Sequence, residues 1–193
     1  NWHGGGQAIS WCFNRSGLND EQRSSLTDAE YERLLEVSKK HQAKLKAEHE
    51  ANSKIAQEKA RILFDTLIFL KKDDSHPYLT KKQIYPYGLR LQKETNNLAV
   101  PIYNIDGNIV NIQWISPTGE KWFFPSAPVS ANFFPIALDI ADKHSDEPIL
   151  IGEGVATMST VYELTNRACV AAMNCGNIPK VAEVIHKKYP NNP

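Results

Sequence analysis

The stretch that most constrains this fold is an apolar run that ends in a single acid between two glycines. Residues 149–151 are apolar, Glu153 lies between Gly152 and Gly154, and residues 155–164 have the spacing of a helix. A buried strand therefore brings the Glu153 carboxylate to its carboxyl end, in a turn without bulky neighbours. Ligands of open α/β sheets bind at that edge, so the position suits a carboxylate that meets a metal ion or a phosphate. A surface glutamate beside a helix start has the same pattern.

A second apolar run completes an α/β unit. Residues 168–173 indicate another strand, and residues 179–188 indicate a helix with Pro179 in its first turn. Both strands are apolar throughout, which is typical of a parallel sheet with two covered faces. The order strand, helix, strand, helix predicts a parallel pair with a right-handed crossover.

The turn after the second strand lies on the same predicted sheet edge as Glu153. It contains Asn174, Cys175, Gly176 and Asn177. Backbone N–H groups of such a turn, and of the helix that follows, can bind an anion. An ordinary strand-to-helix loop has the same composition, so both interpretations stay open. No histidine is placed to activate Cys175, which argues against a nucleophilic role.

The N-terminal third has a long helical pattern. Thr27 and Glu30 form a capping box, and no Gly or Pro follows until Pro77. About 45 helical residues would extend roughly 70 Å at about 1.5 Å per residue, and residues 39–54 are mostly polar. The pattern allows one long helical arm with a solvated middle, or a hairpin broken near residues 52–53. The lack of a strong turn signal favours the single helix.

Between these regions the chain has the pattern of an antiparallel meander. Residues 100–105 and 109–115 flank Asp106 and Gly107, a dipeptide that strongly indicates a tight hairpin. The alternation of the second strand predicts that three apolar residues share one face and two polar residues the other. These are Val110, Ile112 and Trp114 on the first face, and Asn111 and Gln113 on the second.

Lys121 follows the next predicted turn, which contains Thr118 and Gly119. A lysine in this position can meet a phosphate as a point charge. A solvated hairpin lysine has the same pattern. His76, which precedes Pro77, is expected to have a structural role.

Composition restricts the class of protein. The 193 residues suffice for one sizeable domain or two small ones. Basic and acidic residues number 22 each, so a basic field over the whole chain is absent. Only short basic runs remain, each more typical of a solvated face: residues 71–72, 81–82 and 187–188.

The cysteines and the apolar runs bear on compartment. Three cysteines without paired spacing argue against disulfides and a four-ligand zinc site. They favour a reducing compartment, which predicts a cytoplasmic protein. No run reaches the length of a membrane span, and no signal peptide is visible. The chain starts at Asn1 and ends at Pro193, and we expect it to be part of a longer protein.

Together these motifs resemble those of DNA primases of the Toprim superfamily, in particular the primases, often fused to helicases, of phages, plasmids and conjugative elements. The resemblance covers about residues 76–190 and depends on the order of the motifs as well as on the motifs themselves. They are residues 76–79 with Lys82 and 88–90; residues 100–103, 106–107, Gln113 and 119–123; and residues 149–157, 171–174 and 176–179.

The resemblance implies roles for individual residues. Glu153 matches the Toprim glutamate, which acts in proton transfer and is associated with the metal site, and Lys121 matches a lysine that faces the same site. The residues expected to contact nucleotide phosphates are Gly152, Gly154, Asn174, Gly176 and Asn177. The family's next element is a strand ending in Asp-x-Asp that binds Mg²⁺. No Asp-x-Asp follows Glu153, so we expect this chain alone to be inactive.

The sequence thus predicts an α/β chain, α+β overall, in three parts. Residues 1–75 would carry the helical arm, residues 76–145 a β-rich primase subdomain, and residues 146–193 the first half of a Toprim domain. The resemblance implies a primase that joins nucleoside triphosphates into short primers on single-stranded DNA with Mg²⁺, and a replicative helicase as a candidate partner. The alternatives are a nucleic-acid-binding or assembly module without chemistry, and a Toprim nuclease or topoisomerase-like enzyme.

Overall fold

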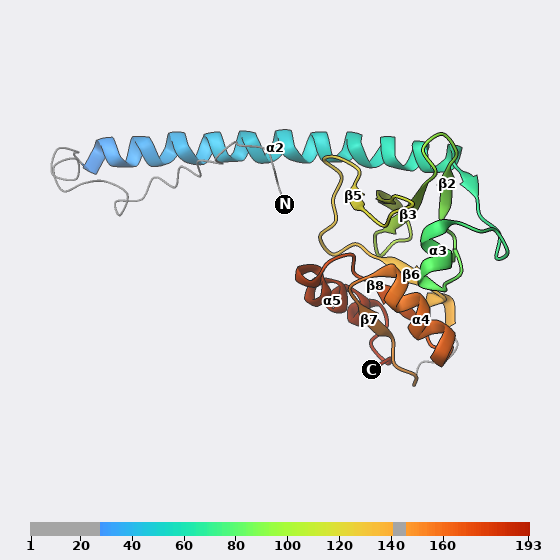
Figure 1. The fold of residues 1–193 in the computed structure, drawn as a ribbon. Helices are drawn as coiled ribbons and strands as arrows, with labels where there is room; N and C mark the ends of the chain where they lie inside the picture. Colours follow the sequence, from blue (N-terminus) through green and yellow to red (C-terminus); the bar gives the residue numbers. More distant parts are fainter. Residues whose placement is uncertain (1–27, 141–145) are drawn as a thin grey trace. The chain divides into compact units, whose positions relative to one another are not determined.

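The computed structural model describes residues 28–140 and 146–193. The chain divides into two compact units, residues 1–51 and 52–193. One helix, α2 (Asp28–Thr66), begins in the first unit and ends in the second without a break (Figure 1). The prediction of a single long helix is therefore confirmed. The predicted cap at Thr27 and a short strand expected at residues 9–13 lie outside the described residues.

The middle of α2 is solvated, as its composition predicts. Residues 39–52 are all exposed. Pairs of opposite charge four residues apart line this part of the helix, and each such pair stabilises a helix by roughly 0.2–0.5 kcal/mol. They are Lys40 with Glu36, Lys44 with Glu48, and Lys46 with Glu50.

The helix α2 ends earlier than the sequence predicts, at Thr66 instead of near Pro77. Its last turn contains no basic residue to interact with the free carbonyl groups. Arg90, from a distant strand, supplies the missing donor: its Nη1 donates to the Phe64 carbonyl at 2.7 Å, and its guanidinium stacks on the Phe64 ring at 4.4 Å. The apolar residues that follow form a short strand.

A five-stranded antiparallel sheet lies at the centre of the second unit. The predicted meander and its hairpin are confirmed, with Gly107 at a φ of +83°. The first two strands were not predicted. In spatial order the strands are β1 (Ile68–Phe69), β2 (Arg90–Gln92), β3 (Asn97–Tyr103), β4 (Ile109–Ile115) and β5 (Lys121–Phe123).

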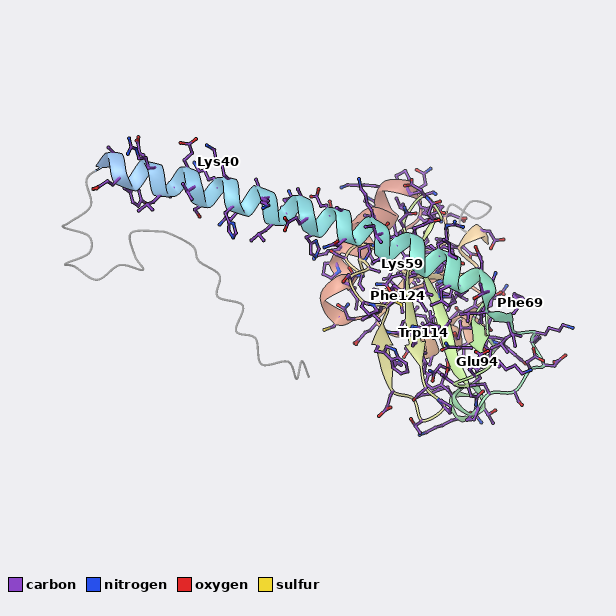
Figure 2. All side chains as sticks on the ribbon, turned by 90° about the horizontal axis from the view of Figure 1, so that it is seen from above. Lys40, Lys59, Phe69, Glu94, Trp114 and Phe124 are labelled. Atoms are coloured by element: carbon purple, nitrogen blue, oxygen red, sulfur yellow. The ribbon has the colours of Figure 1, made fainter. Side chains whose placement is uncertain are left out.

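Both faces of this sheet are covered. Ala60 and Phe64 of α2 pack on one face, against Ile112 and Trp114 among others, and Figure 2 shows Trp114 beneath the helix. Val110 was predicted on this face but belongs to the core on the other face. The reason is a register shift in the pairing of β3 with β4, between Ile102 and Tyr103, that rotates the start of β4.

The polar residues of β4 are buried instead of facing solvent. Asn111 is 0% exposed, and its amide donates to the carbonyl groups of Ala127 and Pro128 at 2.8 and 3.3 Å. The loop after β5 therefore covers this part of the sheet.

A short helix, α3 (Pro77–Lys82), connects β1 to β2. His76 caps it: Nδ1 accepts from the Tyr78 N–H at 3.1 Å, so Nε2 carries the proton and donates to the Asn96 carbonyl at 2.9 Å. With 2% of its surface exposed, His76 has the structural role that the sequence predicts.

The C-terminal segment forms a second, three-stranded sheet. The parallel pairing of β7 with β8 confirms the predicted strand–helix–strand unit, and β6 pairs with β8 in the antiparallel direction. In chain order the elements are β6 (Phe134–Ile136), η2 (Leu138–Ile140), β7 (Leu150–Gly152), α4 (Val155–Thr165), β8 (Cys169–Ala171), η3 (Cys175–Asn177) and α5 (Ile178–Lys188).

The two sheets share a core. Tyr103, at the end of β3, exchanges two backbone hydrogen bonds with Phe133, just before β6, at 2.7 and 3.0 Å. Side chains of α3, β3, β4, α4 and β8 belong to one buried cluster. The predicted β-rich and C-terminal parts therefore pack against each other within the second unit. Among the described residues, no helix combines the length and the hydropathy that a bilayer crossing requires.

Candidate functional site

Glu153 lies in the turn between β7 and α4, and its side chain is exposed. The pairing of β7 with β8 extends into this turn, since the Ala172 and Met173 N–H groups donate to the carbonyls of Gly152 and Glu153, both at 2.8 Å. The carboxyl ends of the two parallel strands therefore meet at one edge, and this edge holds the acid.

The backbone at this edge is strained at one position. Met173 has a φ of +72° although it is a buried, non-glycine residue. Such a conformation costs of order 1–3 kcal/mol, and strained residues cluster at functional sites. Met173 directly precedes Asn174, the first residue of the predicted phosphate-binding turn.

Gly152 lies directly against the side chain of Met158. An added Cβ at this position would overlap Sδ of Met158, a buried residue in the first turn of α4. Gly154 is different: the nearest atom to a Cβ there is Thr157 Oγ1 at 3.9 Å. Gly152 thus lets α4 approach the end of β7 closely, which fixes the turn that carries Glu153.

The side-chain amide of Asn177 joins two segments of the backbone, an arrangement called here a bracket. Its Nδ2 donates to the carbonyls of Val129, Asn132 and Ala172 at 2.8–3.0 Å, and its Oδ1 accepts from the Ala131 N–H at 2.7 Å. These bonds hold the loop before β6 against the end of β8. Both amide protons of Asn177 are committed inside the fold, and its backbone N–H donates to the Asn174 carbonyl at 3.2 Å. The predicted phosphate contact of Asn177 therefore has no uncommitted donor in this structure.

The neighbouring residues of this turn are more accessible. Asn174 is half-buried and Gly176 is exposed. The Asn174 side chain does not cap the short helix η3 that follows it. These two residues, unlike the Asn177 side chain, keep polar groups that a ligand can reach.

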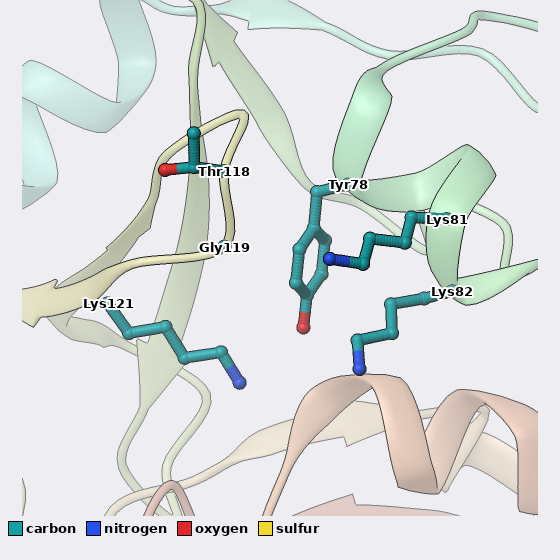
Figure 3. Close-up of a pocket in the computed structure, with 6 residues that line it drawn as sticks. All are labelled: Tyr78, Lys81, Lys82, Thr118, Gly119 and Lys121. Atoms are coloured by element: carbon teal, nitrogen blue, oxygen red, sulfur yellow. The ribbon is translucent and has the colours of Figure 1, made fainter.

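Lys121 begins β5, directly after the turn that contains Gly119, and lines a pocket with residues of α3 (Figure 3). The pocket has a volume of ≈ 180 Å³. Its lining residues are Tyr78, Lys81, Lys82, Thr118, Gly119 and Lys121. The Lys121 Nζ lies 5.8 Å from the centre of the Tyr78 ring. Lys121, predicted to lie near a phosphate, thus shares a pocket with two further lysines.

Glu153 and Lys121 are not joined by any hydrogen bond or ion pair among the described residues, and Glu153 does not line the lysine pocket. The two sites are connected through the core, because Tyr78 belongs to the same buried cluster as Val155 and Met158 of α4. Their joint action in one reaction stays a prediction.

The described residues contain no group of three or more His, Cys, Asp or Glu side chains that could hold a metal ion. Mg²⁺ is usually bound by one or two carboxylates together with substrate phosphates. Glu153 can supply one carboxylate, and the described residues do not form a metal site around it. The prediction of a metal role for Glu153 therefore depends on ligands from elsewhere.

The sequence pattern did not indicate that Tyr78 and Lys81 are parts of a site. The signal that could have found them is spacing, because Tyr78, Lys81 and Lys82 stand at positions i, i+3 and i+4 and share one face of a helix. The helix has only six residues, and so short a segment shows no clear helical period in the sequence.

Two curated relatives that match the chain have the same description. No family model and no solved structure matches the sequence significantly. The chain is 34% identical over 119 residues to a protein of Escherichia coli described as DNA primase TraC; the match covers 61% of this chain and 11% of that protein. Another Escherichia coli protein with this description is 27% identical over 190 residues, which is 97% of this chain and 12% of that protein.

The chain thus spans about a tenth of the length of the curated relatives it matches. The identities of 27% and 34% are modest, but the matched part includes nearly the whole chain in one of the two comparisons. These similarities support a relationship of this chain to the primase family.

Proposed function

We propose that this chain is part of a DNA primase of the Toprim type, in which it contributes to the joining of nucleoside triphosphates into primers on single-stranded DNA. The observation that carries the proposal is the similarity to DNA primase TraC over 97% of the chain. The exposed carboxylate at the carboxyl edge of two parallel strands supports it, because ligands of α/β sheets bind there.

In this proposal Glu153 transfers protons at the reacting hydroxyl or phosphate, a role that a positioned carboxylate can fill. Lys121 stabilises the negative charge of the phosphates. Mg²⁺ would neutralise triphosphate charge when bound, with ligands beyond the described residues. Gly152, Gly154, Asn174 and Gly176 offer backbone groups at the same edge. Association with a replicative helicase in the cytoplasm belongs to the same proposal.

The test is primer synthesis by the full-length protein on a single-stranded DNA template with Mg²⁺. Glu153→Gln keeps the shape of the side chain and removes its charge and its basicity. Loss of a general acid or base typically costs about 10²–10⁴-fold in rate, so we expect a decrease in that range. Glu94→Gln is the matched control, because Glu94 is also exposed but lies in the turn between β2 and β3. Equal rates for Glu153→Gln and the control would exclude the proposed role.

A nucleic-acid-binding module is the second candidate, and a specific groove favours it. Phe69 and Tyr85 are large exposed aromatic residues, 61% and 43% exposed, and both line a groove of ≈ 390 Å³ with Lys71 and Lys72. The Lys72 Nζ lies 4.5 Å from the centre of the Tyr85 ring. Aromatic side chains beside cations are what proteins use to stack the bases of single strands.

Binding of a single-stranded oligonucleotide distinguishes this candidate from the enzyme. Stacking contributes about 1–3 kcal/mol per base, so Tyr85→Leu should weaken binding roughly tenfold. Trp122→Leu is the control, since Trp122 is equally exposed at 43% but lies outside the groove. Weaker binding by Tyr85→Leu alone, in a protein that makes no primers, would favour the binding module. Equal binding by both variants would exclude a stacking role for the groove.

A further inference from the structure

We propose that Tyr78, Lys81, Lys82 and Lys121 form a binding site for a phosphate group. For the part that Lys121 has in it, the inference rests on the proposed function. Tyr78, Lys81 and Lys82 add a site that neither the chemistry of Glu153 nor the comparisons assign. The site is built from two segments that are distant in the sequence, the helix α3 and the turn between β4 and β5.

The helix α3 presents three of the four residues on one face. Tyr78, Lys81 and Lys82 are spaced i, i+3 and i+4, which brings them together on a helix. The cap by His76 and the left-handed residue Gln83 (φ +55°) set the two ends of α3. The helix therefore holds two lysines beside one tyrosine in a defined arrangement, although it is short.

The turn between β4 and β5 closes the other side. Ser116 is buried, and its Oγ accepts from the Glu120 N–H at 3.0 Å, while the Gly119 N–H donates to the Ser116 carbonyl at 2.9 Å. Gly119 has a φ of +98°, and a Cβ there would lie 3.6 Å from the Tyr78 ring. The turn is thus fixed against the tyrosine and directs Lys121 towards α3 (Figure 3).

The charge of this pocket is not balanced by the protein. Lys81, Lys82 and Lys121 are exposed, none of them forms an ion pair within the part of the chain that the structure describes, and no carboxylate lines the pocket. Three ammonium groups around one pocket repel each other, and an anion between them would remove this cost. Lysines are regular phosphate binders because they act as compact point charges.

Tyr78 gives an independent indication of a ligand. The residue is only 2% exposed, and its hydroxyl has no hydrogen-bond partner. A buried polar group without a partner destabilises the fold, and such groups are rare in native proteins. Figure 3 shows the hydroxyl between the ends of the Lys82 and Lys121 side chains. Movement of these flexible lysines would let a phosphate oxygen accept from it.

The size of the pocket indicates which part of a ligand it holds. Its volume of ≈ 180 Å³ is below the range of about 300–1,000 Å³ for pockets that enclose a whole small ligand. A phosphate or a short phosphate chain fits the chemistry, and the rest of the ligand would lie outside. The phosphate can belong to a free nucleoside triphosphate or to the backbone of a nucleic acid.

The test measures binding by calorimetry at low salt in the full-length protein. The three probes are inorganic triphosphate, ATP and an oligonucleotide without terminal phosphates. The variants are Lys82→Gln/Lys121→Gln and Tyr78→Phe. The control, Lys59→Gln/Lys93→Gln, removes the same charge from two exposed lysines outside the pocket. Thermal unfolding of each variant shows that it is folded.

We expect the double pocket variant to bind at least one probe about tenfold or more weakly than the control, because charge-assisted hydrogen bonds contribute about 1.5–3 kcal/mol each. Tyr78→Phe should weaken the same probe by a smaller factor. Losses with triphosphate and ATP identify a free polyphosphate as the ligand, and a loss with the oligonucleotide alone identifies backbone phosphate. Equal binding of all three probes by the pocket variant and the control would overturn the proposal.

The same measurement separates this inference from the proposed function. Glu153 lies outside the pocket, so Glu153→Gln should retain triphosphate binding even where primer synthesis is lost. A protein that binds triphosphate through the lysines but makes no primers would refute the primase proposal alone. A protein that makes primers while the lysine variant binds every probe like the control would refute this inference alone.

Discussion

The strand-end edge around Glu153 and the lysine pocket beside Tyr78 are built in opposite ways. At the edge, backbone hydrogen bonds join the two strands, and the buried side-chain amide of Asn177 contacts four backbone partners. In the pocket, three lysines form no ion pair and one buried hydroxyl has no hydrogen-bond partner within the described residues. The edge is therefore internally satisfied, whereas the pocket holds unsatisfied groups.

This difference separates stability from binding. Groups that are satisfied within the fold contribute to its free energy of unfolding, and their loss should destabilise the protein. Groups that lack an internal partner destabilise the fold, and we expect a bound ligand to satisfy them and so stabilise the protein. Substitutions of internally satisfied groups at the edge should therefore lower stability, and substitutions in the pocket should lower binding without lowering stability.

The largest effect on stability is expected for Asn177→Ala. It removes two donor protons, shared among three carbonyl acceptors, and one accepted hydrogen bond. At about 0.5–1.5 kcal/mol net per bond, the free energy of unfolding should fall by about 3 kcal/mol. Asn174→Ala, in the same turn, removes a half-buried side chain that does not cap the following helix, and should cost less than about 0.5 kcal/mol. Urea unfolding of both variants measures the difference. Similar losses for the two would contradict the assignment of Asn177 as the bracket.

The next effect is expected for Gly152→Ala. Its methyl group would overlap Met158 in the core, and overpacking typically costs about 1–3 kcal/mol. Gly154→Ala meets no atom closer than 3.9 Å and should change stability by less than about 0.5 kcal/mol. A double-mutant cycle locates the cause: in a Met158→Ala background, Gly152→Ala should cost clearly less. An unchanged cost would mean that the strain has another origin.

Sequence patterns predicted those parts of the fold whose signals are local. Two apolar runs and two helix starts predicted the unit from β7 to α5. The Asp106-Gly107 dipeptide predicted the hairpin. The end of α2 was not predictable in this way, because the donor that caps it is Arg90 on a distant strand. The place of Val110 was missed because a register shift in the strand pair has no residue signature.

The same distinction between local and long-range signals applies to the candidate site. Glu153 was predictable because strand, acid and helix are adjacent in the sequence. The pocket around Lys121 was not, because its other residues come from a six-residue helix that only the tertiary structure brings opposite the turn. Asn177 was predicted to bind phosphate from its position in a turn, and no local signal shows that its amide is committed to a loop far away in the chain.

A smaller, pH-dependent effect is expected for Cys169, which is fully buried at the start of β8. Burial raises the pKa of this thiol from 9.0 to about 11. The unfolded chain therefore loses this proton at lower pH than the folded chain, and the stability that the neutral thiol contributes is lost as pH rises from about 9 to about 11.

Thermal unfolding between pH 8 and 11 can detect this loss. The stability advantage of wild type over Cys169→Ala should shrink by roughly 1 kcal/mol by pH 10. Cys175→Ala is the control for the loss of a thiol outside the core, because Cys175 is exposed. A constant gap between wild type and Cys169→Ala would show that the thiol does not carry the effect.

The smallest effect on stability is expected for Tyr78→Phe. The sign of the change in the free energy of unfolding shows whether the hydroxyl stabilises the fold. A tyrosine hydroxyl with internal hydrogen bonds would cost about 0.5–1.5 kcal/mol on removal. The Tyr78 hydroxyl has no partner, so the phenylalanine variant should be as stable as wild type or more stable by up to about 1 kcal/mol. Phosphate should then raise the unfolding temperature of wild type more than that of Tyr78→Phe, because only wild type donates from this hydroxyl. A destabilised variant would show that the hydroxyl serves the fold, and the contrast between the edge and the pocket would then fail at its clearest point.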